Sequence, residues 1–447
     1  MHQSATYQIL EIEHQFHYHE KLPIELRIEI IACLPDLKSL RSIALSSISL
    51  YQAYTLARRE AHTNILRTQF DGIVQVQDAI AAVRSKPLHV SEASNRDKII
   101  ALLDDRRRSE EIRRLRTQTR SKLPLPDDPT NEQEIRDLLE LHEEANWLLD
   151  DYCRNAPCPW WTDSDTWNKK VLPLELSNIE KGRWYRAFYR LQTYCNIFGQ
   201  GEIALDSKKT GKAMFYWNKN FTNEEVWRLF FGPFAPWEYE EFKCLAKYVF
   251  DRNGQLYQQI SDDLEKYGHE MPRLPDRLRA TVLPSCALLE TDDLRMNAWD
   301  NREVLASFGP SFLVRFLKAA FITQRDMVYA NSHRGLSWLP DGPLRIDFSD
   351  KYPLLYPADR FNFGTNWEGL KALVLTLPEI DRPSLGWQQN YYQLTDGSEP
   401  TDEVFSDYFE TDGGHIRRLT WQMCLWDDER SAKWQTEYGA PVKDHGI

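Results

Sequence analysis

The residues that come closest to a chemical motif are three histidines near the N-terminus. His14, His17 and His19 lie within HQFHYH, where neutral imidazoles could hold a metal ion. No thiol or carboxylate accompanies them at a recognised ligand spacing. We therefore expect no metal site at this cluster, and no other part of the sequence indicates a cofactor.

Motifs for nucleotide, nucleophilic, zinc and dinucleotide chemistry are missing from the sequence. The stretch KTGK at 209–212 lacks the upstream glycine and the following hydroxyl residue of a phosphate-binding loop. No G-x-S-x-G elbow, H-E-x-x-H helix or G-x-G-x-x-G turn occurs. Carboxylates are plentiful, but only a fold can show which of them pair. We predict that the protein is not an enzyme.

An acidic segment at 396–412 could attract a cation or a basic partner. It contains neither lysine nor arginine, and its seven acidic residues are Asp396, Glu399, Asp402, Glu403, Asp407, Glu410 and Asp412. Their spacing does not match a calcium-binding loop, which favours a solvated acidic surface loop.

The most informative pattern is apolar and lies between residues 21 and 54. Pro23 and Pro35 are each expected at a helix start, because a proline at the first helical position loses no hydrogen bond and presets φ. The hydroxyls of Ser46 and Ser47 can cap a third helix that begins directly after them. We therefore predict three short helices in this segment.

The first of these helices carries more apolar surface than one core can use. Two stripes recur at helical spacing: Leu22, Leu26 and Ile30 on one side, and Ile24, Ile28 and Ile31 on another. A unit of about 40 residues rarely has enough core to bury both stripes. The surplus stripe must contact something else, either later helices of this chain, as in an ordinary helical subdomain, or a partner protein.

The same residues match a known family pattern. The segment Leu22-Pro23-x-Glu25-Leu26, then Ile30, then Leu34-Pro35-Asp36-Leu37-x-x-Leu40 and the later Leu45 and Leu50 closely resemble an F-box, particularly the form common in filamentous fungi. The match covers about 35 residues in register. Two later segments, 186–199 and 236–251, resemble more loosely the helices that follow the F-box in one large fungal family, which implies a helical body.

The F-box resemblance implies docking onto a Skp-type adaptor, and through it onto the cullin and RING subunits of an SCF-type ubiquitin ligase. It implies adaptor-binding roles, as direct contacts or as the small core behind them, for Leu22, Pro23, Glu25, Leu26, Ile30, Leu34, Pro35, Leu37, Leu40, Leu45 and Leu50. Glu25 could pair with a basic group on the adaptor or favour the helix N-terminus through its dipole. A target protein would bind the C-terminal body, and this chain would supply positioning rather than catalysis.

Composition and charge limit the remaining possibilities. The apolar fraction of 42% includes 15 tryptophans, so most of the chain should fold. A net charge of −12 disfavours nucleic-acid binding through bulk electrostatics, and we expect neither a nucleic-acid nor a membrane partner. No secretory signal and no window of about 18 apolar residues occurs, so we expect a cytoplasmic or nuclear protein.

The cysteine pattern agrees with a reducing compartment. The seven cysteines are odd in number and form no C-x-x-C pair, which argues against a disulfide framework or a zinc module. They are Cys33, Cys153, Cys158, Cys195, Cys244, Cys286 and Cys424.

The whole chain is predicted to be mainly α. We divide it into an N-terminal extension (1–19), the F-box segment (20–60), a helical linker (61–125), a helical domain (126–270), and a mostly helical, loop-rich C-terminal region (271–447) with at most a few short strands. A proline-rich stretch at 121–129 is predicted to form a boundary, and a capping box is predicted from Thr130. Helices are predicted over 183–198, where Gly199 stops the helix, from Pro236 to just before Asn253-Gly254, and over 367–377. A strand is predicted near 344–348.

The arginines at 106–108 could form a nucleic-acid patch, but the interleaved Asp104 and Asp105 favour a solvated, ion-paired helix face.

Two other classes of function are open at this point. A scaffold or regulator could bind the adaptor without joining a ligase, and co-purification of a cullin would distinguish the two. An enzyme of unknown activity would instead show a deep pocket with convergent polar groups.

Overall fold

The computed structural model describes residues 22–119, 129, 131–159, 161–202, 220–268, 298–332, 372, 374–377, 379–388 and 424–438. Helices make up 77% of the interpretable residues and no strand occurs among them, which confirms the predicted mainly α fold class. The predicted strand near 344–348 lies outside the described residues, as do 121–128 and most of the helix predicted over 367–377.

The chain forms two compact units. The first comprises residues 1–76 and 128–143, and the second comprises 77–127 and 144–447. These limits differ from the five predicted segments, because the helix α4 (Ile48–Phe70) crosses the boundary expected at residue 60 and residues 128–143 belong with the N-terminal helices.

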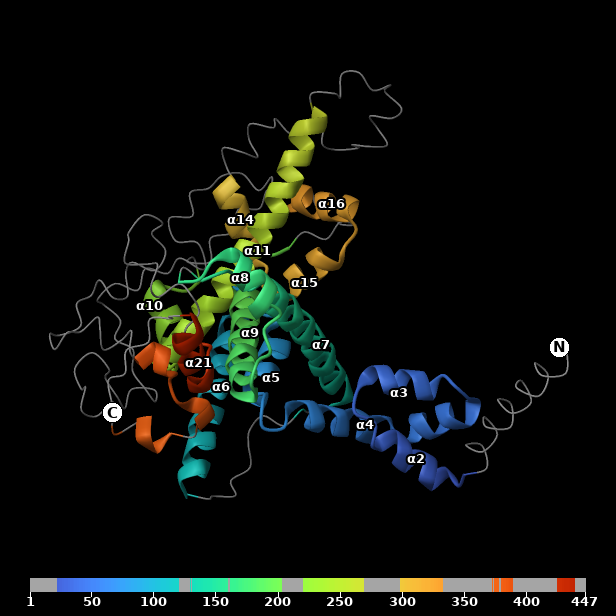
Figure 1. The fold of residues 1–447 in the computed structure, drawn as a ribbon. Helices are drawn as coiled ribbons and strands as arrows, with labels where there is room; N and C mark the ends of the chain where they lie inside the picture. The colour runs from blue at the N-terminus through green and yellow to red at the C-terminus, as the bar shows by residue number, and fades with distance from the viewer. Residues whose placement is uncertain are drawn as a thin grey trace, which may run out of the picture. The chain divides into compact units, whose positions relative to one another are not determined.

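Three helices form the beginning of the first unit, as predicted: α2 (Ile24–Ala32), α3 (Leu37–Ala44) and α4 (Figure 1). Pro23 is the N-cap of α2 rather than its first helical residue. α3 begins two residues after Pro35, because the carboxylate of Asp36 accepts the backbone N–H of Ser39 at 2.7 Å and so caps the helix. Ser47 caps α4 through the N–H of Leu50.

The helix α4 is long rather than short, and its buried face is built from small residues. Ala53, Ala57 and Ala61 recur every four residues between the buried Leu50 and Ile65, and α4 packs most extensively against α2. Alanines allow the two backbones to approach closely. The amide of Asn64 strengthens this contact by donating to the carbonyl of Ala32 at 3.2 Å.

The helix α7 (Glu132–Asn155) is shared by the two units. Its residues 132–143 belong to the first unit, and the rest belong to the second. The N-cap of α7 is Asn131, whose side-chain oxygen accepts the N–H of Glu134 at 2.9 Å. The cap was predicted one residue earlier, at Thr130, which lies outside the described residues.

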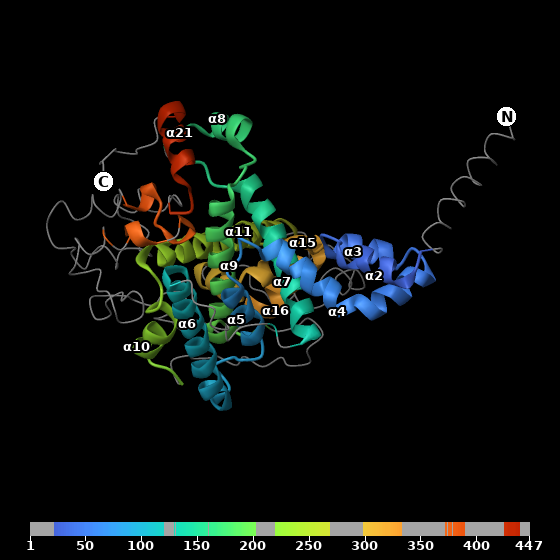
Figure 2. The ribbon, with the colours of Figure 1, turned by 90° about the horizontal axis from the view of Figure 1, so that it is seen from below.

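The second unit is built around α9 (Asn178–Phe198), which packs against α11 (Pro236–Gly268) (Figures 1 and 2). Its other elements are α5 (Val76–Ser85), η1 (Ala93–Asn95), α6 (Arg96–Thr119), α8 (Ser164–Thr166), η2 (Trp167–Val171), α10 (Asn223–Val226), η4 (Trp227–Phe231), α14 (Ala298–Ser307), α15 (Pro310–Lys318), α16 (Phe321–Ser332), η7 (Glu379–Asp381) and α21 (Asp428–Tyr438). Nearly every side chain of α9 is buried, so this helix is the core of the unit.

The start of α9 lies five residues before the prediction, and its end agrees with it. Ser177 and Glu180 form a reciprocal capping box at the N-terminus, a signal that is visible in the sequence SNIE. At the C-terminus Gly199 donates its N–H to the carbonyl of Cys195 and lies close beneath the carbonyl of Ser307 in α14. A side chain at Gly199 would therefore overlap both carbonyl oxygens.

Replacing Gly199 by alanine is expected to destabilise the second unit by about 2 kcal/mol or more, because two backbone segments must shift to admit one methyl group. Gly201→Ala is the matched control, since a Cβ there meets nothing within 4 Å. Urea midpoints of the two variants and the wild type test this. Equal midpoints for the two variants would contradict the close approach.

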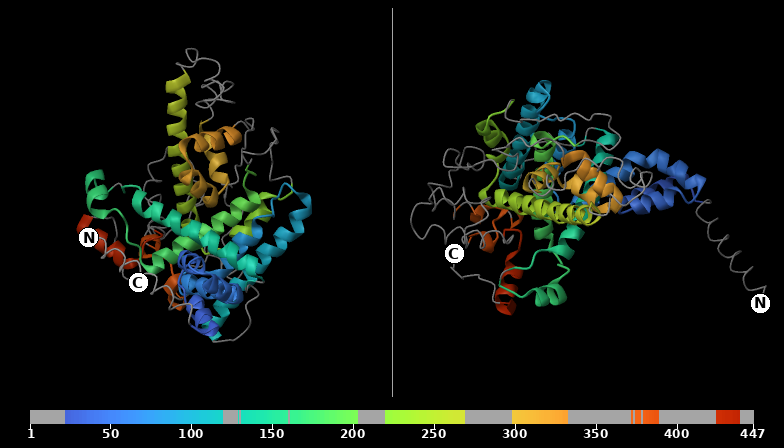
Figure 3. Two further views of the ribbon diagram at one scale, coloured as in Figure 1. Left: turned by 90° about the vertical axis from the view of Figure 1, so that its right-hand side faces the viewer. Right: turned by 90° about the horizontal axis from the view of Figure 1, so that it is seen from above.

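The helix α11 does not close before Asn253-Gly254 but continues through both residues to Gly268. Asn253 is buried, and its amide donates to the carbonyl of Val249 at 2.8 Å, while Gly254 lies next to the side chain of Arg302 from α14. Figure 3 shows α14 to α16 packed beside α11. Tertiary packing thus overrides the local preference of Asn-Gly for a turn.

The arginine run in α6 divides between surface and interior. Arg107 and Arg108 pair with Asp104 and Asp105 at the surface, as predicted for an ion-paired helix face. Arg106 is instead buried and pairs with Asp78 of α5 at 2.6 Å, so the prediction of one uniform solvated face was wrong for this residue.

Candidate docking surface on the N-terminal helices

The two apolar stripes of α2 have different environments. Ile31 is fully buried, and Ile24 and Ile28 are partly buried on the same side. Leu26 and Ile30 lie one turn apart on the other side and are 50% and 38% exposed. The structure therefore assigns the stripe of Ile24, Ile28 and Ile31 to the core and leaves the stripe of Leu26 and Ile30 at the surface.

A second exposed apolar group lies at the junction of α3 and α4. Leu45 is 69% exposed and Ile48 is 80% exposed, whereas Leu40 and Leu50 are buried. Tyr51 follows Ile48 at a spacing of three, on the same side of α4, and is also exposed. We call Leu26, Ile30, Leu45, Ile48 and Tyr51 the outward apolar set.

The residues predicted to bind an adaptor therefore separate into two roles. Leu40 and Leu50 belong to the core. Exposed residues of the predicted set are Pro23, Glu25, Leu26, Ile30, Pro35 and Leu45, and partly exposed ones are Leu22, Leu34 and Leu37. Glu25 lies in the first turn of α2, where the helix dipole favours a carboxylate.

Sequence reasoning missed Ile48, Tyr51 and Leu56, which is 70% exposed further along α4. Their orientation follows from the phase of the helix: once Leu50, Ala53 and Ala57 face inward, these three positions must face outward. Reading the alanines as the buried face would have identified them.

The interior of the first unit contains two histidines. The ring of His142 in α7 packs on that of Phe70 in α4 with centroids 4.8 Å apart, and burial lowers the pKa of His142 to about 4. Burial also lowers the pKa of His62, which packs on Tyr54. Both histidines therefore favour the neutral form in the folded state.

Acid should weaken this unit in a defined window. The unfolded chain binds a proton at His142 more tightly than the folded chain between about pH 6.5 and 4, so stability is full above pH 6.5 and falls as the pH is lowered. From pH 7 to pH 5 the loss from His142 is about 2 kcal/mol. The urea midpoints for hydrogen exchange of the α4 amides should be lower at pH 5 than at pH 7. This decrease should be smaller in His142→Gln. An identical pH dependence in wild type and variant would contradict this.

Among the described residues, a dense cluster of charged side chains lies in the core of the second unit. Asp78 pairs with Arg106 and Arg190, and Glu238 pairs with Arg190 at 3.0 Å. Arg186 donates to both oxygens of Glu241, at 2.7 and 2.9 Å, and lies 3.5 Å from Asp381 of η7. These groups are almost completely buried and paired with one another, so the cluster joins α5, α6, α9, α11 and η7.

The aromatic residues of α9 are also structural. Trp184 and Phe188 stack on each other with ring centroids 5.5 Å apart, and the stripe continues through Leu191, Cys195 and Phe198, all buried. This is a core stripe, and no cofactor is needed to explain it.

Several sequence candidates lie outside the described residues: His14, His17 and His19, the stretch 209–212 and the acidic segment 396–412. Within the described ranges, no group of three or more histidine, cysteine or acidic side chains has metal-binding geometry. In that same part of the chain, no helix is both long and apolar enough to cross a bilayer.

Comparison with known proteins adds no relative to this picture. No protein-family model, no curated protein and no solved structure matches the chain.

Proposed function

We propose that this chain is a substrate receptor of an SCF-type cullin–RING ubiquitin ligase, with the outward apolar set of the first unit binding a Skp-type adaptor. The resemblance of residues 22–50 to an F-box suggests which kind of partner binds. The exposed side chains of the outward apolar set suggest where it binds. In this proposal the second unit carries the site for a target protein.

One observation carries the proposal: the first unit buries a row of alanines along α4 while several of its large aliphatic side chains stay exposed. Ala53, Ala57 and Ala61 of α4 are buried, while Leu26 and Leu45 are 50% and 69% exposed. A helical subdomain that served only its own stability would bury its leucines first, because each contributes about 2 kcal/mol when removed from water. Exposed leucines and isoleucines on a small unit are therefore typical of a surface that a partner covers.

The chemistry of such a partner follows from the residues around the set. Glu25 and Glu29 flank Leu26 and Ile30 on α2, and both glutamates are exposed. An apolar groove with basic residues at its rim would match this pattern, since charged residues at the edge of an interface guide association while the apolar centre supplies affinity.

Purification of the tagged full-length chain from its native cells tests the proposal. Recovery of a Skp-type adaptor together with a cullin is the expected result. The adaptor without a cullin would favour a scaffold or regulator outside the ligase. Recovery of neither protein would contradict the proposal.

Target proteins should be found with a bait that cannot reach the ligase. Leu26→Asp with Leu45→Asp is expected to remove adaptor binding and to leave the second unit intact, because neither residue belongs to it. Targets that the wild-type chain would pass to ubiquitination should then accumulate on the variant, and comparison of the two baits identifies them.

A further inference from the structure

Two buried cysteines lie in contact in the second unit, although 180 residues separate them in the sequence. Cys244 lies in the first third of α11, and Cys424 lies four residues before α21 begins. Their sulfur atoms are 3.2 Å apart. A disulfide bond measures about 2.05 Å, so the two sulfurs need to move together by only about 1 Å to bond.

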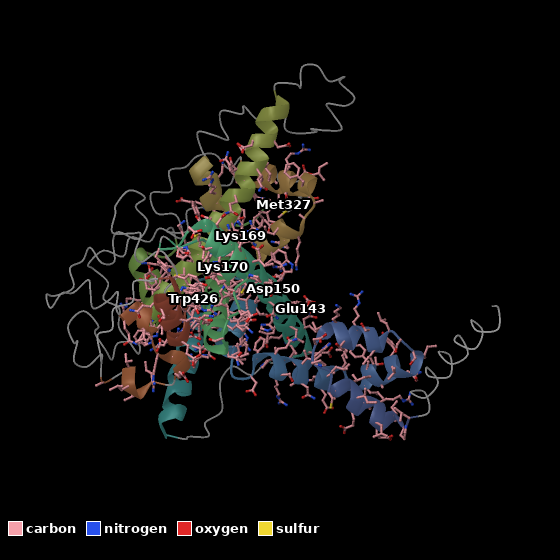
Figure 4. All side chains as sticks on the ribbon, viewed as in Figure 1. Glu143, Asp150, Lys169, Lys170, Met327 and Trp426 are labelled. Atoms are coloured by element: carbon pink, nitrogen blue, oxygen red, sulfur yellow. The ribbon has the colours of Figure 1, made fainter. Side chains whose placement is uncertain are left out.

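The segment that carries Cys424 is fixed in place by its neighbours. The carbonyl of Trp426 accepts a hydrogen bond from Arg183 of α9 at 2.7 Å. Trp426 is labelled in Figure 4. Further along, the guanidinium of Arg430 pairs with Glu180 of α9 at 2.6 Å. Trp434 of α21 packs on the rings of both Trp426 and Trp167, with centroids 5.2 and 5.7 Å apart.

These contacts place Cys424 opposite Cys244 without help from a covalent bond. The closeness is thus a property of the reduced fold, and a bond between the two sulfurs would preserve the arrangement rather than create it. Sequence spacing could not reveal the pair, because nothing local relates residue 244 to residue 424.

We propose that Cys244 and Cys424 are a cross-linking site, which forms a reversible disulfide when the chain meets a low-molecular-weight disulfide such as oxidised glutathione. One protein sulfur, as its thiolate, attacks the glutathione disulfide and releases one glutathione thiol. The second protein sulfur then attacks the mixed disulfide and releases the other. In total, two protein thiols are oxidised to one disulfide, and one glutathione disulfide is reduced to two thiols.

The reaction should be slow. Both cysteines are more than nine-tenths buried, and burial raises the pKa of the Cys424 thiol, so little of it is thiolate at neutral pH. The exposed Cys33 of the first unit should react with thiol reagents well before the pair does. Once formed, the bond ties residues 424–438 to α11 and should raise the thermal midpoint of the second unit, because it restricts the unfolded chain across a long loop.

Peptide mapping of the full-length chain tests this inference. The folded protein is incubated with oxidised glutathione or with dithiothreitol, unfolded in the presence of N-ethylmaleimide and digested with trypsin. Cys244 then lies in the short peptide 244–247 and Cys424 in the peptide 419–430. The expected result is a linked pair of these peptides after oxidation, absent after reduction, with a higher thermal midpoint in the oxidised sample.

Variants guard against chance pairing. Cys195→Ser should leave the linked peptides unchanged, and Cys424→Ser should remove both the link and the rise in thermal midpoint. Full alkylation of Cys244 and Cys424 after the oxidative treatment would overturn the inference, as would a disulfide from Cys424 to any other cysteine. Adaptor binding plays no part in this test, so its outcome is separate from that of the proposed function.

Discussion

Replacing both Leu26 and Leu45 by aspartate is expected to abolish capture of a Skp-type adaptor. In the complex each carboxylate would lie in a desolvated apolar interface without a partner charge. The two changes together should weaken binding by at least about 100-fold, which corresponds to about 2.7 kcal/mol. The free chain should lose little stability, since both leucines are half or more exposed in it. A pull-down with purified adaptor measures the effect.

The matched control is Leu375→Asp. Leu375 is 67% exposed and belongs to the second unit, so this variant makes the same chemical change at a comparable exposure but away from the outward apolar set. It should capture the adaptor as the wild type does. Leu40→Asp would be uninformative, because Leu40 is buried and its loss would unfold the unit. Undiminished capture by the double variant would remove the structural basis of the proposed function.

Replacing Arg186 by methionine is expected to cost about 3–5 kcal/mol of the stability of the second unit. Methionine fills much of the volume but leaves Glu241 and Glu238 without their shared cation in the core. Burial raises the pKa of Glu241 even with Arg186 present, and removal of that arginine should raise it further. Urea unfolding monitored by tryptophan fluorescence measures the loss, because the tryptophans among the described residues lie in this unit.

Lys247→Met is the control for the second prediction. Lys247 pairs with Asp251 on the same helix, α11, but both side chains are about half exposed, and such pairs contribute at most about 1 kcal/mol. A similar small effect for both variants would mean that the buried charges of α9 and α11 do not hold the unit together.

Local signals predicted those parts of the fold that local chemistry decides. Ser47 caps α4, Gly199 ends α9, and the three N-terminal helices occur in the predicted order because cap residues and helical spacing act over a few residues. Asp36 was overlooked as the N-cap of α3 because Pro35 was taken as the first residue of the helix. The predicted start was therefore two residues too early.

Features that depend on distant segments could not be predicted in this way. The helix α11 continues through Asn253-Gly254 because α14, some 45 residues later, packs on it. Arg106 of α6 is buried because it pairs with Asp78 of the neighbouring helix α5. The pairing of Cys244 with Cys424 has the same origin. Hydrophobic spacing marks which residues share a side of a helix, but only the fold shows which side faces inward.

The candidate docking surface was half predictable for this reason. The two stripes of α2 were visible in the sequence, and the structure shows that Ile31 faces inward and Leu26 outward. Ile48 and Tyr51 became candidates only when the alanines of α4 proved to be its buried face.

Hydrogen exchange of the full-length chain, with and without purified Skp-type adaptor, tests the central claim most directly. The measurement reports which amides a bound partner protects. Protection should appear in residues 24–33 and 45–56, which carry the outward apolar set, and not in α21. Absence of binding, or protection confined to the second unit, would contradict the account.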